Sequence, residues 1–167
     1  MQEVYTSPAD NTVGFVPENI PHEFKAFDHW VVWRLEERDS EPTKVPYSAR
    51  TGRRANTTDS RTWTTFSDAL EALEDGRWSG LGFVFSSGDP FVGIDFDKCR
   101  DPETGEVAAK VLEYIGKFAD AYVEISTSGK GIHLITQGKL RDGKRRGKVE
   151  MYGQERFFAL TGVLLDA

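Results

Sequence analysis

Two aspartates, Asp95 and Asp97, interrupt the apolar segment FVGIDFD at residues 91–97. Because side chains alternate across a β-strand, residues two positions apart point to the same face. The two carboxylates are therefore expected side by side, with Ile94 and Phe96 on the opposite face. Like charges this close repel each other unless a cation lies between them. The pair indicates a divalent metal site, and a solvated pair at a sheet edge is the structural alternative.

Two further polar features follow in the same half of the chain. STSGKGIHL (126–134) is a glycine- and serine-rich loop followed by His133. Such a loop directs backbone N–H groups and small hydroxyls outward, which suits phosphate, and Lys130 adds positive charge. Glu150 lies in the strand-like run KVEMYG (148–153) and meets the aspartates if the two strands are neighbours. Each feature alone could be a turn, a buried histidine or a surface ion pair, but together they favour a site for metal and phosphate.

Bulk composition narrows the classes of protein. The 167 residues, 38% hydrophobic and 29% charged, are typical of one globular domain. A net charge of −6 argues against a protein that coats nucleic acid without specificity. Cys99 is the single cysteine, which excludes an internal disulfide and a cysteine-rich zinc site. No apolar run approaches a membrane span and the first residues do not resemble a signal peptide, so we expect a cytoplasmic protein without a membrane partner.

Positive charge is concentrated in two segments, SARTGRR (48–54) and GKLRDGKRRGK (138–148). Solvated loops are the usual explanation of such runs. Lysine and arginine also give sequence-independent, salt-sensitive contacts to a nucleic-acid backbone. The candidates for contacts to a DNA template or primer are Lys144, Arg145, Arg146 and Lys148.

The elements that must position these residues are predicted from hydrophobic patterns and turn signals. Helices are expected at 64–76 and at the end of 101–120. Strands are expected at 29–36, 44–48 (an edge strand, because it contains a proline), 81–86, 91–97, 121–127, 131–137, 148–153 and 156–162. The turn SSGDP between 81–86 and 91–97 predicts a hairpin. This order favours an α+β fold with largely antiparallel strands over a doubly wound sheet.

The three polar motifs GIDFD (93–97), SGKGIH (128–133) and VEMYG (149–153) resemble, in this order, those of the archaeo-eukaryotic primase superfamily. The sequence is more closely similar to the catalytic domain of phage and plasmid primase-polymerases, and the likeness runs from Trp30 onward. It implies an RRM-like mixed or antiparallel catalytic sheet with helices, a small N-terminal α/β module, and an active-site cleft between them. The composition of the first residues predicts a flexible leader at 1–20, and the resemblance implies one catalytic domain at 21–167, with modules at about 21–80 and 81–167.

The resemblance also assigns roles to individual residues. It implies that two Mg²⁺ or Mn²⁺ ions are held by Asp95, Asp97 and Glu150, which with His133 form the catalytic set. Ser128 and His133 correspond to the triphosphate-binding pair, with Ser126 as the alternative serine. Further triphosphate contacts are expected from Lys130, Arg156 and Lys44.

The function implied is that of a DNA primase-polymerase in phage or plasmid DNA replication. Its reaction is template-directed nucleotidyl transfer from nucleoside triphosphates (dNTP or NTP), with DNA template and primer as partners. A helicase-like region often follows such a domain, and a phage-encoded protein would act in the host cytoplasm. Two alternatives stay open: a noncatalytic nucleic-acid-binding replication-initiator domain, and a metal-dependent nuclease.

Overall fold

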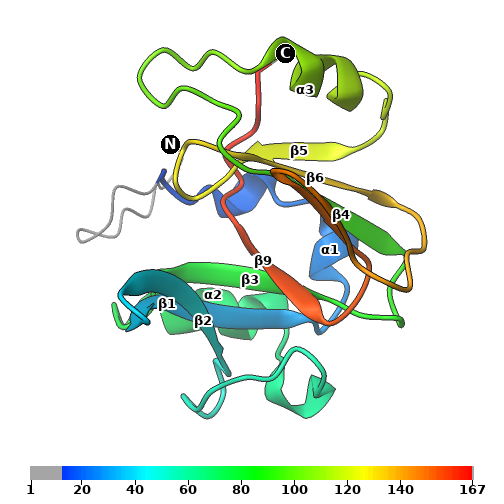
Figure 1. Cartoon of the computed structure of the whole chain (residues 1–167). Coiled ribbons are helices and arrows are strands. Elements are labelled where there is room, and N and C mark those ends of the chain that lie inside the picture. Colours follow the sequence, from blue (N-terminus) through cyan, green and yellow to red (C-terminus); the bar gives the residue numbers. More distant parts are fainter. Residues whose placement is uncertain (1–12, 167) are drawn as a thin grey trace.

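The computed structural model describes residues 13–166, which form an α+β fold with two antiparallel sheets (Figure 1). The α-helices of this part of the chain are α1 (His22–Lys25), α2 (Phe66–Leu73) and α3 (Ala109–Ile115). Two 3-10 helices lie at Pro17–Asn19 and Ser60–Thr62. The predicted fold class is confirmed, and none of the described helices is long and apolar enough to cross a membrane.

The nine strands of the described residues divide between two sheets. The first sheet has the order β2-β1-β3-β9 and consists of β1 (Trp30–Arg38), β2 (Glu41–Tyr47), β3 (Gly80–Phe85) and β9 (Arg156–Leu160). The second has the order β5-β6-β4-β8-β7 and consists of β4 (Phe91–Phe96), β5 (Tyr122–Ile125), β6 (Ile132–Gln137), β7 (Lys144–Arg146) and β8 (Val149–Tyr152). Each predicted strand has a counterpart, and β2 is an edge strand, as Pro46 in the predicted strand 44–48 indicated.

The predicted hairpin between β3 and β4 is wrong. The turn itself is tight, because the buried Asp89 carboxylate accepts hydrogen bonds from the N–H groups of Ser86 (2.7 Å) and Phe91 (2.8 Å). However, β3 is already paired with β1 on one side and β9 on the other. No edge of β3 remains for β4, so the chain crosses from the first sheet to the second at this turn.

The two sheets are not contiguous halves of the chain. Strand β9 follows the last strand of the second sheet but pairs with β3 in the first. The division into modules at about 21–80 and 81–167 therefore stays a prediction. The first sheet contains strands from both sides of that boundary. Of the predicted leader, residues 1–12 lie outside the described residues, while Phe15, Val16 and Ile20 are buried.

Alternation along β4 and β6 separates an apolar face from a polar one. Ile94, Phe96, Ile132 and Leu134 form a buried cluster beneath α3, where the ring of Tyr114 lies 5.6 Å from that of Phe96. Burial of each such side chain stabilises the fold by about 1.5–3 kcal/mol. The residues between them, Asp95 and His133 included, point to the other face of the sheet.

The polar face of the second sheet is its inner face, which is directed toward the first sheet. A hydrophobic core between the two sheets covers one end of this inner face. Phe24 of α1 lies at its centre, with its ring 4.7 Å from that of Phe91 and 5.5 Å from that of Tyr122. Residues of both sheets belong to the same buried cluster. The sheets are thus packed together at the apolar end, and the polar residues of the inner face lie beyond it.

Candidate active site

One row of polar side chains crosses all five strands of the second sheet. The cross-strand partners are Glu124 with His133, His133 with Asp95, Asp95 with Glu150, and Glu150 with Arg145. Residues directly opposite each other in an antiparallel ladder share a face. These five residues, which we name the polar row, therefore lie side by side. The expectation that Glu150 meets the aspartates through neighbouring strands is confirmed for Asp95.

Exposure is lowest at the Glu124 end of the polar row and highest at the Arg145 end. The exposed fraction of the side chain is 0% for Glu124, 9% for His133, 33% for Asp95, 28% for Glu150 and 74% for Arg145. The row consequently has a closed end at Glu124 and an open end at Glu150 and Arg145. Charges at the open end are available to a ligand, whereas Glu124 is not.

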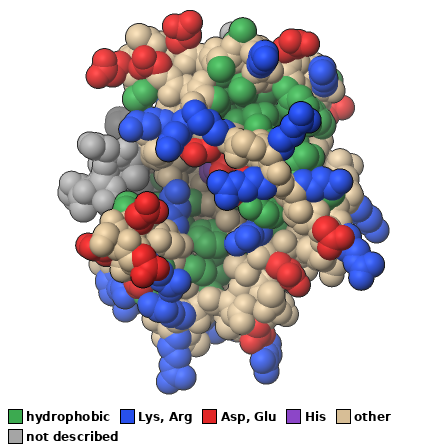
Figure 2. Space-filling view, viewed as in Figure 1, with side chains coloured by type: hydrophobic (Ala, Val, Ile, Leu, Met, Phe, Trp, Pro, Cys, Tyr) green, Lys and Arg blue, Asp and Glu red, His purple; other side chains and the backbone are tan. Residues whose placement is uncertain are grey.

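A cleft of about 1170 Å³ opens onto the row. It is lined by residues of β2, β4, β6, β8 and β9 and by the segment 141–145, so both sheets contribute. The predicted site residues in its walls are Lys44, Asp95, His133, Lys144, Arg145, Glu150 and Arg156. Figure 2 shows Lys and Arg side chains gathered around a hollow in the middle of this face, with carboxylates inside it. A nucleotide fits within a cleft of this size.

Asp95 has fewer compensating contacts than the other two carboxylates of the polar row. Burial raises its pKa, the nearby His133 and Lys44 oppose that rise, and the negative charges of Asp97 and Glu150 add to it. The ion pair to His133 is long, with 3.7 Å between Asp95 Oδ1 and His133 Nε2. A group in this situation gains from a bound cation.

Glu150 is held by its neighbours in the open end of the row. The hydroxyl of Tyr152 donates to its Oε2 at 2.6 Å, and Nε of Arg145 lies 3.2 Å from its Oε1. The Arg156 guanidinium lies over the Tyr152 ring, 4.9 Å from its centroid. The side chain of Glu150 therefore forms its ion pair with an exposed arginine, although its neighbour on the adjacent strand β4 is Asp95.

Asp97 lies one residue beyond β4 and is exposed. Its backbone N–H donates to the carbonyl of Lys148 at 2.9 Å, and its side chain is not part of the cleft wall. Within residues 13–166, no three His, Cys, Asp or Glu side chains are already placed to hold one metal ion. The donor types suit Mg²⁺ or Mn²⁺, and a bound cation would offset the burial and the neighbouring negative charges that raise the pKa of Asp95, so the residues fit such ions chemically without being prearranged for them.

The glycine- and serine-rich loop is tightly closed. Ser126 Oγ accepts from the N–H of Gly131 (3.1 Å) and lies 3.4 Å from Ser128 Oγ, which accepts from the N–H of Lys130 (3.2 Å). A side chain at Gly131 would meet the carbonyl oxygen of Phe96 at 2.8 Å, so only glycine fits there. Ser128 and Lys130 are exposed outside the cleft wall, and their triphosphate role stays a prediction.

Lys44 enters the cleft from β2 of the first sheet. Burial lowers its pKa, and the negative charges of Asp95 and Asp97 act in the opposite direction. Its ammonium also lies 5.8 Å from the centroid of the Trp33 ring. A cation from the first sheet thus faces the carboxylates of the second across the cleft.

The basic segment 138–148 is not only a loop. Lys144–Arg146 form β7, which pairs with β8 at the edge of the second sheet. The sequence pattern did not predict this strand, because all three of its residues are charged and an edge strand needs no apolar face. Arg146 and Lys148 are exposed, and neither belongs to the cleft wall.

Two residues beside His133 escaped the sequence reasoning. Glu124 is fully buried and contacts the ring directly, and its signal was a lone acid within the apolar run AYVEIS. Phe158 of β9 stacks on the imidazole, with ring centroids 4.7 Å apart and an interplanar angle of 24°. Nothing in RFFALTG marked Phe158, because its partner comes from a distant strand.

Comparison with known proteins gives one relative of stated activity. No protein-family model matches the chain. The DNA primase-polymerase of Nitratiruptor phage NrS-1 is 36% identical over 147 residues, a match that covers 84% of this chain and 20% of the phage protein. The chain therefore spans about one fifth of the length of that relative. The sequence is related to part of a phage DNA primase-polymerase.

Proposed function

We propose that this chain is the catalytic part of a DNA primase-polymerase that performs template-directed nucleotidyl transfer in phage or plasmid DNA replication. The observation that carries the proposal is that Asp95 and Glu150 are cross-strand neighbours, beside His133, on the wall of a cleft of about 1170 Å³. The similarity to the phage protein supports the same assignment.

Two Mg²⁺ or Mn²⁺ ions would be held by Asp95, Asp97 and Glu150. When bound, such ions activate a primer 3′-hydroxyl and stabilise the leaving pyrophosphate. The chain's own part is to bring the three carboxylates within reach. To bind a metal ion, the Glu150 carboxylate must give up its ion pair with Arg145. The free-energy cost is small because an exposed ion pair contributes little to stability.

The triphosphate would lie among the cations of the cleft. Lys44 approaches from β2 and Arg156 from β9, so the negative substrate would be held between the two sheets. His133 presents Nε2 on the same side as Asp95, and the loop with Ser128 and Lys130 would contact the phosphates farthest from the reacting atom. Preorganised donors of this kind stabilise the charge that develops in phosphoryl transfer.

DNA would follow the basic edge of the second sheet. A second groove, of about 500 Å³, shares Arg141 and Gln154 with the cleft and is also lined by Lys139. Together with Lys144, Arg145, Arg146 and Lys148 these residues offer phosphate contacts. The proposal includes a helicase-like region elsewhere in a longer protein, and action in the cytoplasm of the host cell.

The decisive experiment is a primer-extension and de novo synthesis assay with Mg²⁺ and with Mn²⁺. We expect extended products from the wild type and none from Asp97→Ala, with Asp120→Ala, an exposed acid outside the cleft, as the active control. Normal incorporation by Asp97→Ala would refute the metal role. Nucleotide release without extension would favour a nuclease, and DNA binding without metal-dependent nucleotide binding in calorimetry would favour an initiator domain.

A further inference from the structure

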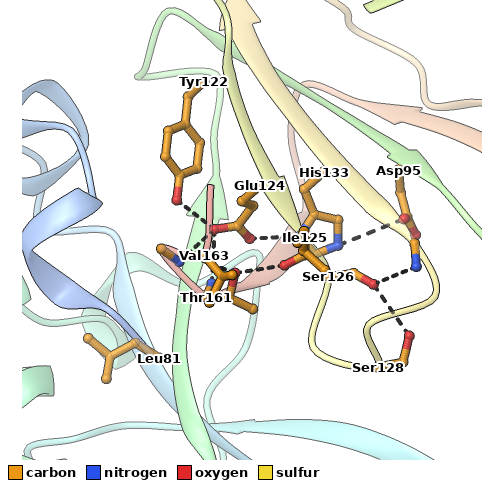
Figure 3. Close-up of polar contacts among 12 residues, drawn as sticks. Leu81, Asp95, Tyr122, Glu124, Ile125, Ser126, Ser128, His133, Thr161 and Val163 are labelled. Atoms are coloured by element: carbon orange, nitrogen blue, oxygen red, sulfur yellow. Dashed lines mark hydrogen bonds and ion pairs between the residues drawn. The ribbon is translucent and has the colours of Figure 1, made fainter. Parts of the chain in front are cut away.

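Glu124 is a buried carboxylate that the proposed reaction does not use. Its side chain is 0% exposed, at the closed end of the polar row. Four groups donate to it: Nδ1 of His133 and the Tyr122 hydroxyl, together with the N–H groups of Thr161 and Gly162 (Figure 3). A carboxylate has about four acceptor positions, so Glu124 is saturated and its orientation is fixed.

The two oxygens of Glu124 have different tasks. Oε2 accepts from Tyr122 Oη at 2.6 Å and from the N–H groups of Thr161 and Gly162, both at 2.9 Å. This leaves Oε1 for His133 Nδ1, at 2.9 Å. Gly162 has φ +67°, and a side chain there would collide with the carbonyl of Val16. The backbone that anchors Oε2 is thus itself held in place.

The contact determines which nitrogen of His133 carries a proton. Because a carboxylate only accepts, Nδ1 must be the donor, and the remaining nitrogen, Nε2, points toward Asp95 in the cleft. Stacking on Phe158 restrains the ring from its face. Histidine protonated at both nitrogens donates from both, so an Nδ1 bound to Glu124 leaves Nε2 as the donor for a phosphate.

We infer that Glu124 is a positioning residue that holds His133 Nδ1 and thereby presents Nε2 to the triphosphate. The inference rests on the proposed function for the identity of the ligand, whereas the Glu124–His133 contact itself does not. Partners that orient a metal-binding histidine in this way change metal affinity or activity by about 10- to 100-fold when they are altered, and we expect an effect of the same order here.

Glu124→Gln is the informative substitution. The three donors at Oε2 require the amide oxygen on their side, which places the amide NH₂ against His133 Nδ1. Nδ1 must then accept rather than donate, so the ring can carry a proton only on Nε2 and can no longer be the doubly protonated cation that would face the triphosphate. The variant retains the shape and the backbone contacts while it reverses the one hydrogen bond in question.

The first test is nitrogen NMR of ¹⁵N-histidine-labelled protein, with His133→Ala to assign the ring. In the wild type we expect His133 Nδ1 to be protonated, and in Glu124→Gln we expect it to be unprotonated. A wild-type ring protonated only at Nε2 would overturn the inference, even if the variant failed to fold. Tyr122→Phe is the matched control: it removes another donor to the same carboxylate and should leave the tautomer of His133 unchanged.

The second test is kinetic. Glu124→Gln should raise KM for the nucleotide by about 10- to 100-fold with a smaller change in kcat, and it should add nothing further in the His133→Ala background. A purely structural role would instead lower the fraction of active protein and act equally in both backgrounds, which would overturn the inference. If no nucleotide is incorporated by any form, the proposed function fails, while the NMR result still decides whether Glu124 orients His133.

Discussion

Two carboxylates flank the same imidazole and experience opposite surroundings. Glu124 has no exposed surface and accepts four hydrogen bonds, whereas Asp95 is 33% exposed and has only a 3.7 Å ion pair to His133. Both are direct cross-strand partners of His133. A saturated acid stabilises the fold and orients its neighbours, while an unsaturated acid at a cleft is available for a ligand. The partners of an acid, rather than its type, therefore distinguish the two roles.

The largest effect is expected at the open end of the row. Asp95→Asn should reduce nucleotidyl transfer by roughly 10³-fold or more. It removes a negative charge that would hold the metal ions, and such ions stabilise the transition state by several kcal/mol. Rates of single-nucleotide primer extension measure this loss. If the variant extended primers at the wild-type rate, Asp95 would not bind a ligand needed for the reaction, and the proposed difference in role between Asp95 and Glu124 would be wrong.

At the closed end the larger effect is on stability. Glu124→Ala leaves the Tyr122 hydroxyl, two backbone N–H groups and His133 Nδ1 without an acceptor, at a cost of about 3–5 kcal/mol in the free energy of unfolding. Urea denaturation provides the measurement. Glu150→Ala is the comparison and should cost much less. Equal losses for the two variants would contradict the contrast between closed and open ends.

The pH dependence of stability separates the two acids further. Burial, with the charges of Asp97 and Glu150, raises the pKa of Asp95 above the ordinary aspartate value of 3.8, although His133 and Lys44 oppose the rise. The folded protein thus binds this proton more tightly than the unfolded chain. The resulting stability is present below the ordinary pKa and is lost as pH rises through the raised one.

We therefore expect wild-type protein to lose stability relative to Asp95→Asn as the pH is raised from about 4 to 7, in urea titrations with a chelator. A constant difference between wild type and Asp95→Asn over this range would contradict the raised pKa. The same titration of Glu113→Gln, an exposed acid on α3, should run parallel to the wild type.

The smallest effect is expected at the basic edge. Arg146→Ala should weaken template binding modestly and reduce the slope of log affinity against log salt by about 1, since one phosphate contact is lost. Fluorescence anisotropy with single-stranded DNA at several salt concentrations measures the slope. Lys117→Ala, two residues beyond the end of α3 and outside both grooves, should leave the slope unchanged. An unaltered slope in Arg146→Ala would remove the edge from the DNA path.

Much of this arrangement follows from local sequence. The alternation in FVGIDFD and KVEMYG correctly placed Asp95 and Glu150 on strands, and neighbouring strands then brought them together. Asp97 could not be placed as well, because the strand ends at Phe96 and its face is no longer determined by the pleat.

What escaped prediction depends on long-range pairing. The turn at Ser86–Pro90 carries a hairpin signal, yet β3 receives its second neighbour from β9, some seventy residues later in the chain. Likewise, Glu124 reads as an ordinary polar residue until Thr161 and Gly162 supply its donors. Local patterns contain no information about such partners.

The placement of β9 also determines when the site can assemble during synthesis. The first sheet and the wall that carries Arg156 and Phe158 are incomplete until residues 156–160 have left the ribosome. All carboxylates of the polar row are synthesised before β9, so the opposite wall of the cleft is still missing when they emerge. Such distant pairing slows folding because loop closure precedes the stabilising contacts, so the nascent chain gains a nucleotide-sized cleft only once β9 has paired with β3.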